Sequence, residues 1–564
     1  MRRLTPVLLT SLLCGASTFA VEDVATNSRQ AGAGADAYKK LAAAKSESTK
    51  MGKQLDPRAQ GDWLPKKYEI RLRIDPAAKL IEGSVAMQAL AIAANLRAIT
   101  LDLAGNMSVA SVQSGGRELK FSQLNDQLDI TLAQPLKANT VFDIVINYQG
   151  QPKGKGFTFS EHQSVPMVST YGLPFTAKQW WPCKDESSAK VNSLDLIITV
   201  PDSLSVASNG KLVKERDNND GTKTFFWSVR YPIYPDTVSL AITNYKIFTL
   251  PYRYSATDIM DMAFYVYPED LEKAKIDFGV LPDMMASHVS LFGDYPFLKE
   301  KYGVAEFAVQ SFREHQTMPS YSAMFITGDH RNDFILAHEL AHQWFGNSIS
   351  VKNWSHVWLN EGFATYAYAL WREHVDGRDG YLSTIRDLGS GHFEGSLYIK
   401  DTADNSKLFS DTIFNKGAWV LHMLRHVMGD EKFFLALKNY VKTFAYKNAS
   451  TEDFQKVCER EYGHALDWYF KEWVYGTGQP HYKVSWTNTR NDNRSVVKLA
   501  ITQIQPDSIV FRMPLDVELT TSSGSKTFVV WNKEKTQEFD FSVEGNVTQV
   551  KIDPSDWVLK TISP

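Results

Sequence analysis

Five consecutive residues, His338-Glu339-Leu340-Ala341-His342, have the side chains and the spacing of a metal-binding helix. Residues four apart lie on the same face of an α-helix, so both imidazoles can reach one metal ion. Glu339 lies beside them and can polarise a water molecule on that ion. The motif predicts a hydrolytic metal site; the alternative is a chance grouping of His and Glu on a polar helix face.

A third ligand is expected from Glu361, which stands in the run Leu-Asn-Glu-Gly-Phe. Zinc sites that perform chemistry use three protein ligands and keep the fourth position open. The chain between His342 and Glu361 is 18 residues long, enough for a helix end, a loop and the start of another helix. This second motif argues against chance, and the sequence predicts a zinc site formed by His338, His342 and Glu361.

The composition is that of an ordinary globular protein with several domains. Of its 564 residues, 43% are hydrophobic and 22% are charged. A formal net charge of -3 offers no electrostatic argument for binding nucleic acid. Besides Cys14, the chain has only Cys183 and Cys458, too few for a disulfide framework. Whether these two pair depends on a distance that the sequence does not contain.

The first 20 residues resemble an export signal. Arg2 and Arg3 precede a mostly apolar run over residues 4–13, which is too short to span a bilayer. Thr18-Phe19-Ala20 places small residues where a signal peptidase cleaves, so we expect cleavage after Ala20. No later segment is long and apolar enough to cross a membrane. We therefore expect an exported protein, periplasmic or extracellular, without a transmembrane anchor.

Changes in hydrophobic period divide the remaining chain. Residues 21–61 are rich in Ala, Lys, Ser and Gly and predict a linker. Alternation with period two, as over residues 68–74 and 194–200, predicts an N-terminal β domain over 62–247. A helical period predicts an α-rich domain over 248–475, with single helices over 271–292 and 334–345. Alternation then returns, and a β-sandwich is expected over 476–564.

The zinc motif and its flanks resemble the M1 family of zinc aminopeptidases. The matching segments are His-Glu-Leu-Ala-His-Gln-Trp-Phe-Gly-Asn at 338–347, Trp-Leu-Asn-Glu-Gly-Phe-Ala at 358–364 and Trp-Trp-Pro-Cys-Lys-Asp at 180–185. The resemblance implies a multidomain α+β fold with a β saddle, a thermolysin-like catalytic domain and a β-sandwich. It also implies peptide substrates and one Zn²⁺ per chain.

The same resemblance assigns roles to individual residues. His338, His342 and Glu361 correspond to the zinc ligands, and Glu339 corresponds to the general base. The family binds the free α-amine of its substrate with acidic residues, and Glu314 in Ser-Phe-Arg-Glu-His matches one of them.

Three positions depart from the family pattern. Arg313 stands where relatives have Met, which brings a positive charge close to the expected ammonium site. It could also point away and pair with a carboxylate, because alternate strand residues face opposite sides. Leu173 stands where relatives carry a second amine-binding Glu. Phe414 replaces a tyrosine whose hydroxyl donates to the oxyanion, and losing such a donor costs about 10²–10³ in turnover. Tyr398 or another tyrosine could supply that hydroxyl.

These observations support three hypotheses. The first is an exported zinc metallopeptidase, specifically an aminopeptidase that acts on short peptides. The second is a zinc-retaining protein that binds peptides with weak or no cleavage, suggested by Phe414, Leu173 and Arg313. The third is a metallohydrolase of altered specificity, such as one for N-blocked peptides. The sequence gives neither the oligomeric state nor the preferred substrate side chain.

Overall fold

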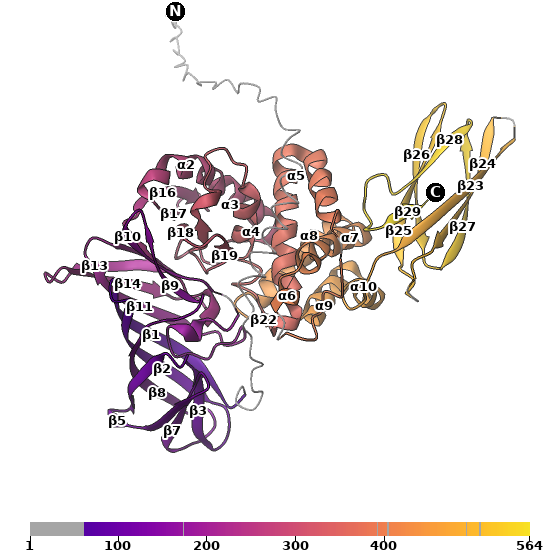
Figure 1. The fold of residues 1–564 in the computed structure, drawn as a ribbon. Coiled ribbons are helices and arrows are strands. Elements are labelled where there is room, and N and C mark those ends of the chain that lie inside the picture. Colours follow the sequence, from indigo (N-terminus) through magenta and orange to yellow (C-terminus); the bar gives the residue numbers. More distant parts are fainter. Residues whose placement is uncertain are drawn as a thin grey trace, which may run out of the picture.

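The computed structural model describes residues 61–563, except 173, 392, 403–404, 492 and 507–508. The predicted signal peptide, all but the last residue of the predicted linker, and Leu173 lie outside the described residues. Figure 1 shows a strand-rich N-terminal part, a central helical part and a C-terminal pair of sheets, arranged in that order. The multidomain α+β class is confirmed. Among the described helices, none combines the length and apolar character needed to cross a membrane.

An eight-stranded sheet forms the N-terminal part, in the order β13-β14-β11-β1-β2-β8-β4-β5. Tyr68, Ile70, Leu72 and Ile74 of β1 are buried and alternate with more exposed residues, as the period-two pattern predicted. Its strands are β1 (Trp63–Asp75), β2 (Leu80–Ala91), β4 (Met107–Ser114), β5 (Arg117–Glu118), β8 (Val141–Gly150), β11 (Ser193–Pro201), β13 (Lys211–Asp217) and β14 (Thr222–Val229).

Two smaller sheets complete this part of the chain. One has the order β3-β7-β6, and the other has the order β12-β15-β10-β9. The strands are β3 (Leu96–Asp102), β6 (Lys120–Leu124), β7 (Gln127–Leu136), β9 (Phe157–His162), β10 (Val165–Thr170), β12 (Ser205–Ser208) and β15 (Leu240–Thr243). The turn Pro235–Thr237 just before β15 and the segment just after β10 both reach the central domain.

The central part begins with a five-stranded sheet, in the order β16-β17-β18-β20-β19. The strands are β16 (Lys246–Arg253), β17 (Ile259–Val266), β18 (Tyr302–Phe307), β19 (Phe312–Arg313) and β20 (Ser320–Ser322). The edge strand β19 runs antiparallel to β20 and lies beside the helix that carries the His-Glu-x-x-His motif. The sheet edge and this helix form the two sides of the candidate site.

Helices make up most of the rest of the central part; two of them lie between β17 and β18, and the others follow β20. They are α2 (Leu271–Asp277), α3 (Leu281–Phe292), α4 (Asp333–Ala341), α5 (Trp358–Gly389), α6 (Asn405–Leu408), α7 (Gly417–Met428), α8 (Asp430–Phe444), α9 (Thr451–Tyr462) and α10 (Asp467–Trp473), with a short pair β21 (Ser350–Val351) and β22 (Asn448–Ala449). The single helix predicted over residues 271–292 is wrong. A 3₁₀ turn at Phe278–Val280 separates α2 from α3, because Pro282 in the first turn of α3 lacks the N–H that a continuous helix needs.

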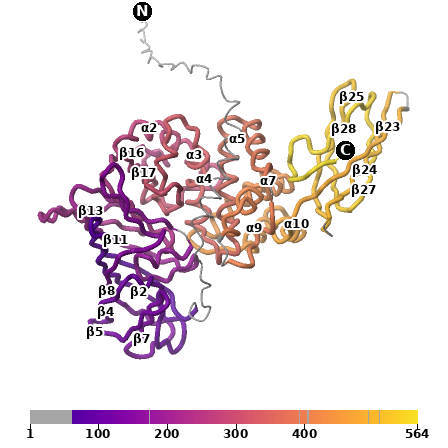
Figure 2. Tube along the Cα trace, viewed as in Figure 1, coloured from indigo at the N-terminus to yellow at the C-terminus, as the bar shows by residue number. Residues whose placement is uncertain are grey.

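Two sheets packed face to face form the C-terminal part, which confirms the predicted β-sandwich. Their orders are β27-β24-β23-β29 and β26-β25-β28. The strands are β23 (His481–Asn491), β24 (Arg494–Gln503), β25 (Met513–Thr521), β26 (Gly524–Asn532), β27 (Thr536–Glu544), β28 (Val547–Ile552) and β29 (Thr561–Ser563). Trp557 joins this part to α7 by stacking on His422 and His426. Figure 2 shows the central domain between the two β-rich parts.

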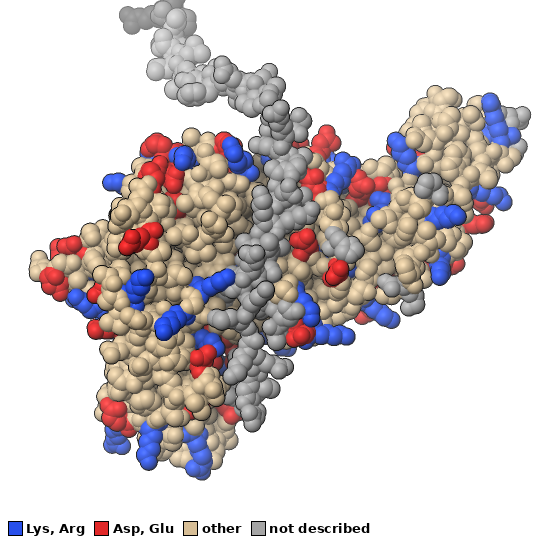
Figure 3. Space-filling view, in the orientation of Figure 1, with Lys and Arg blue, Asp and Glu red and all other residues tan. Residues whose placement is uncertain are grey.

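Lys and Arg side chains are interspersed with Asp and Glu over the face seen in Figure 3. Cys183 and Cys458 are both buried and both free, so the question of their pairing is answered: they are not joined to each other.

Candidate active site

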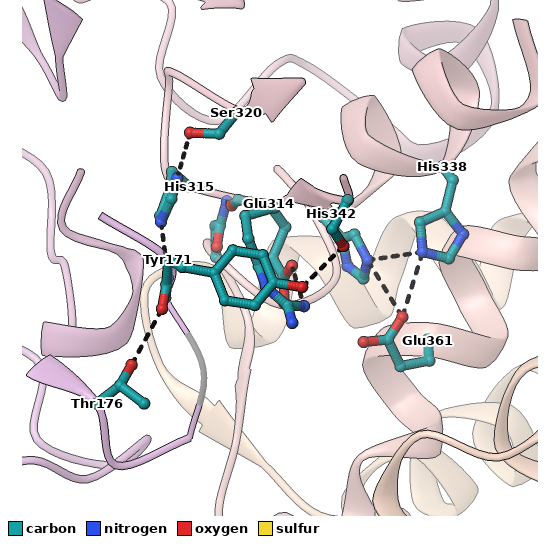
Figure 4. A network of polar contacts seen from close by, with 12 residues as sticks. Tyr171, Thr176, Glu314, His315, Ser320, His338, His342 and Glu361 are labelled. Atoms are coloured by element: carbon teal, nitrogen blue, oxygen red, sulfur yellow. Dashed lines mark hydrogen bonds and ion pairs between the residues drawn. The ribbon is translucent and has the colours of Figure 1, made fainter. Parts of the chain in front are cut away.

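Helix α4 and the start of α5 bring the three predicted ligands together. The Nε2 atoms of His338 and His342 are 3.0 Å apart. The Oε2 atom of Glu361 is 3.2 Å from the first nitrogen and 3.4 Å from the second. Figure 4 shows these side chains pointing at one another from the two helices. All three are buried, so they form a compact triangle of donor atoms shielded from solvent.

This triangle has the dimensions of a zinc site. Ligands at roughly 2.0–2.1 Å from a tetrahedral zinc ion lie roughly 3.3 Å from one another, which matches the three edges. Two imidazole nitrogens and one carboxylate oxygen are also the ligand types that zinc accepts. His342 Nδ1 lies 3.0 Å from the carbonyl of Phe345. That nitrogen donates its proton to the carbonyl, which leaves the Nε2 lone pair directed at the metal position.

Two glycines set the position of Glu361. Gly362 of α5 and Gly417 of α7 pack so closely that a Cβ on either one would lie 2.9 Å from the Cα of the other. This close contact also brings in the π-helical turn Thr412–Lys416 that precedes α7. Phe414 in this turn stacks on His338 with ring centres 5.9 Å apart. Position 414 therefore lies beside the metal site, and its ring has no hydroxyl to offer there.

Glu339 and Glu314 place two further carboxylates near the three predicted ligand atoms. A carboxylate oxygen of Glu339 lies within 4.8 Å of ligand nitrogens of both His338 and His342. A carboxylate oxygen of Glu314 lies within 4.8 Å of a ring nitrogen of His342 and a carboxylate oxygen of Glu361. The predicted base and the predicted amine-binding residue thus both lie next to the metal position.

The segment after β19 is tied to the end of the metal helix. Asn347 Nδ2 donates to the carbonyl of Glu314 at 2.6 Å. The backbone N–H of Thr317 donates to Gln343 Oε1 at 2.8 Å. Gln343 and Asn347 lie within five residues after His342, so the turns at the end of the metal helix also fix the segment that carries Glu314.

Arg313 faces the site and does not point away. It is 1% exposed, and its guanidinium carbon lies 4.1 Å from the centre of the Tyr171 ring. Its Nη1 atom is 3.9 Å from Glu314 Oε2. Arg313 and Glu314 line one small cavity, whose other described walls are Gly172, Pro174, Tyr234, Asp236, Thr237, His315, Trp354 and Phe409. Of the two alternatives for Arg313, the positive charge near the ammonium site is the one observed.

His315 fastens this wall to the N-terminal domain. Its Nε2 accepts the N–H of Gly172 at 3.2 Å, and its Nδ1 donates to Ser320 Oγ at 3.0 Å (Figure 4). Burial lowers the pKa of His315 to about 3, so the ring is neutral and one nitrogen can accept. A Cβ on Gly172 would lie 1.9 Å from the carbonyl oxygen of Asp236, so only glycine allows this approach.

Sequence reasoning missed Tyr234. Its phenol lines the cavity beside Glu314, and its hydroxyl makes no hydrogen bond within the described part of the chain. Burial raises the pKa of Tyr234, and the charges of Glu314, Asp236 and Glu361 raise it further. The side chain lies in the turn before β15, in a different domain from the zinc motif, so no local sequence signal could have pointed to it. Tyr398, considered from the sequence, instead packs on His356 and Tyr475.

Comparison with known proteins identifies the family. The peptidase family M1 domain matches residues 308–473, and the peptidase M1 N-terminal domain matches residues 64–234. The chain belongs to peptidase family M1. In this family and in solved relatives described as zinc metallopeptidases the metal is zinc, and the donor triangle fits it, so Zn²⁺ is the cofactor of this site.

Individual relatives resemble the chain at modest identity. Aminopeptidase M1 of Arabidopsis thaliana is 27% identical over 467 residues, covering 75% of this chain and 51% of the relative. The chain spans about half the length of the curated relatives that it matches.

Two solved structures share the fold. The M1 zinc metallopeptidase of Deinococcus radiodurans is 25% identical, with a TM-score of 0.65 over 75% of this chain and 95% of that chain. Aminopeptidase A of Legionella pneumophila is 18% identical, with a TM-score of 0.78 over 91% of this chain and 61% of that chain. The likeness to aminopeptidase A extends over nearly the whole chain. At 18% identity it shows only that the two proteins share a fold.

Proposed function

We propose that this protein is an exported zinc aminopeptidase that removes single N-terminal residues from peptides. One observation carries the proposal: the Glu314 carboxylate lies within 4.8 Å of the ligand atoms of His342 and Glu361. An α-ammonium group held on Glu314 leaves space for only one residue before the metal position. The first peptide bond is therefore the one presented for hydrolysis.

The side chains have defined tasks in this proposal. Bound zinc supplies a Lewis acid for the scissile carbonyl and lowers the pKa of water. Glu339 takes the proton of the attacking water and delivers it to the leaving amine. Glu314 holds the substrate ammonium by a charge-assisted hydrogen bond. The neutral His315 ties the Glu314 segment to Gly172 of the N-terminal domain, and the amide of Asn347 ties it to the chain that follows the metal helix.

Tyr234 is proposed to take the place of the missing tyrosine at position 414. Its hydroxyl forms no hydrogen bond within the described residues and borders the cavity that also contains Glu314. The phenol is held protonated by burial, so it is a donor at every physiological pH. A donor directed at the developing oxyanion stabilises the transition state more than the ground state.

Export to the periplasm or the medium belongs to the same proposal. It is supported by the sequence of the first 20 residues, in which two arginines precede an apolar run and a small-residue cleavage site. N-terminal sequencing of the protein recovered from the periplasm or medium should begin at Val21. Recovery of full-length protein in the cytoplasm alone would contradict export.

The activity is tested with one peptide in two forms, with a free and with an acetylated N-terminus. Zinc-loaded protein should release the first residue of the free form, as followed by mass spectrometry, and leave the acetylated form intact. Glu339→Gln, which keeps the shape of the side chain, is the control and should lose about 10²–10⁴-fold in rate. Equal cleavage of both forms would instead favour a hydrolase for N-blocked peptides, and no cleavage at full zinc occupancy would favour a peptide-binding protein.

A further inference from the structure

Arg313 is a buried cation with incomplete hydrogen bonding. It is 1% exposed, and its Nε and Nη2 atoms have no hydrogen-bond partner within the described part of the chain. The nearest acidic atom is Glu314 Oε2, at 3.9 Å from Nη1, beyond hydrogen-bond distance. A guanidinium group has five N–H donors, and removing a charge from water is costly unless it is paired. The free donors therefore favour an anionic partner from outside the chain.

A ring contact holds this guanidinium in the cavity. It stacks over the Tyr171 ring at 4.1 Å, a cation–π arrangement. The Tyr171 hydroxyl is itself fixed by a 2.7 Å hydrogen bond to Oγ of Ser311, the residue just before β19. The side chain is thus positioned before any ligand arrives, which lowers the entropic cost of binding one.

Two carboxylates, those of Glu314 and Asp236, belong to the described lining of the cavity. Burial and the neighbouring Asp185 raise the pKa of Asp236 well above its usual range, which disfavours its charged form as a partner for Arg313. Glu314 is the carboxylate assigned above to the substrate ammonium. When that ammonium binds, Glu314 is shared between two cations. The positive charge of Arg313 is then only partly compensated.

We propose that Arg313 binds the side-chain carboxylate of an N-terminal Asp or Glu, so that this enzyme prefers peptides with an acidic first residue. The inference rests on the proposed aminopeptidase function. The ammonium and side-chain carboxylate of such a residue are close together and of opposite charge, like Glu314 and Arg313. A guanidinium fork can hold a carboxylate through two parallel hydrogen bonds.

A carboxylate elsewhere in the substrate fits less well. The C-terminal carboxylate of a dipeptide lies across the scissile bond from the ammonium. Arg313 instead adjoins Glu314 in sequence, and its Nη1 atom lies 3.9 Å from the carboxylate that is assigned above to the ammonium of the first residue. The geometry thus points to recognition of the first side chain.

The test compares isosteric substrates, the coumarylamides of L-Glu and L-Gln, with L-Leu as a neutral reference. For the zinc-loaded natural protein, kcat/KM for Glu should exceed that for Gln by about 10- to 100-fold. Arg313→Met should reduce this ratio to about one or less, and Arg313→Lys should retain part of it. Arg253→Met, at an exposed arginine at the end of β16, is the matched control and should keep the ratio.

The possible outcomes distinguish a failure of the role proposed for Arg313 from a failure of the proposed aminopeptidase activity. A Glu-to-Gln ratio near one in the natural protein, or an unchanged ratio in Arg313→Met at full zinc content, would overturn the role of Arg313. If no substrate is cleaved, the proposed activity fails, and calorimetry with the dipeptides Glu-Ala and Gln-Ala decides the inference. Tighter binding of Glu-Ala that is lost in Arg313→Met would support it, and equal binding would overturn it.

Discussion

The metal side and the substrate side of this site differ in how far they match the pattern expected from the family resemblance. On the metal side, α4 and α5 carry the three predicted ligands and the predicted base, and the three ligand atoms lie 3.0–3.4 Å apart. Two predicted departures lie around them: Phe414 packs on His338 beside the metal position, and Arg313 lies in the opposite wall, to which another domain contributes Tyr234. The proposed metal chemistry depends on two packed helices, while the proposed recognition depends on loops and a strand edge.

The largest expected effect comes from the metal side. His342→Ala should remove zinc and lower hydrolysis by at least about 10³-fold, because the Lewis acid and the alignment of Glu339 are lost together. Metal analysis and arylamide turnover measure both quantities. His374→Ala, at a half-exposed position of α5, is the control and should keep zinc and activity. Full zinc occupancy in His342→Ala would show that the metal binds elsewhere.

The next effect tests whether the substrate wall compensates for Phe414. Tyr234→Phe should lower kcat by about 10²–10³-fold with little change in KM, since it removes one oxyanion donor. Phe414→Tyr should raise the rate of Tyr234→Phe more than it raises the rate of the natural protein. Tyr398→Phe is the matched control. If Tyr234→Phe is as active as the natural protein, position 234 does not replace the family tyrosine.

A smaller effect is expected from the amine-binding carboxylate. Glu314→Gln should lower kcat/KM for free-amine substrates by about 10- to 100-fold, because a charge-assisted hydrogen bond is lost. Zinc content should not change, since the three ligands remain. Loss of zinc in this variant would mean that Glu314 helps to bind the metal and does not serve only the substrate ammonium.

The smallest effect on activity is expected far from both sides. His422 lies in α7, between Tyr381 and the C-terminal sandwich, and burial lowers its pKa to about 3. Below pH 6.5 the unfolded chain binds a proton there and the folded chain does not, so stability is lost as the pH falls from 6.5 towards 3. The stability advantage of the natural protein over His422→Gln should shrink by about 1.4 kcal/mol per pH unit below 6.5.

Urea unfolding of the two proteins at pH 7.5, 6 and 5 measures this difference. Other titrating groups contribute equally to both chains and cancel. A constant difference across this range would show that folding does not lower the pKa of His422. Turnover at pH 7.5 should be the same for both.

Much of the fold could be predicted because local pattern and burial agree. The alternation over residues 68–74 places Tyr68 and Ile70 inside the sheet, and the alternation over residues 194–200 lies within β11 (Ser193–Pro201). The proximity of His338 and His342 could be predicted because helical spacing alone brings the two side chains together. The break at Pro282 was missed because a strong apolar period on both sides concealed it.

The substrate wall was harder to predict, for a physical reason. Tyr234, Asp236 and Gly172 come from the N-terminal domain and reach the site only through tertiary packing. Whether Arg313 faces the cavity depends on the direction of a two-residue strand, and either direction satisfies the local sequence. The sequence shows that residue 313 is an arginine. Its contact with Tyr171 depends on how the N-terminal and central domains pack together.

The most direct test of the account is a zinc-edge anomalous diffraction measurement on crystals soaked with the hydroxamate of an acidic amino acid. One anomalous peak should lie within bonding distance of His338 Nε2, His342 Nε2 and a carboxylate oxygen of Glu361. The ligand ammonium should then contact Glu314, with its side-chain carboxylate on Arg313. A peak at any other position, or an ammonium group turned away from Glu314 beside a correctly placed zinc ion, would contradict the account.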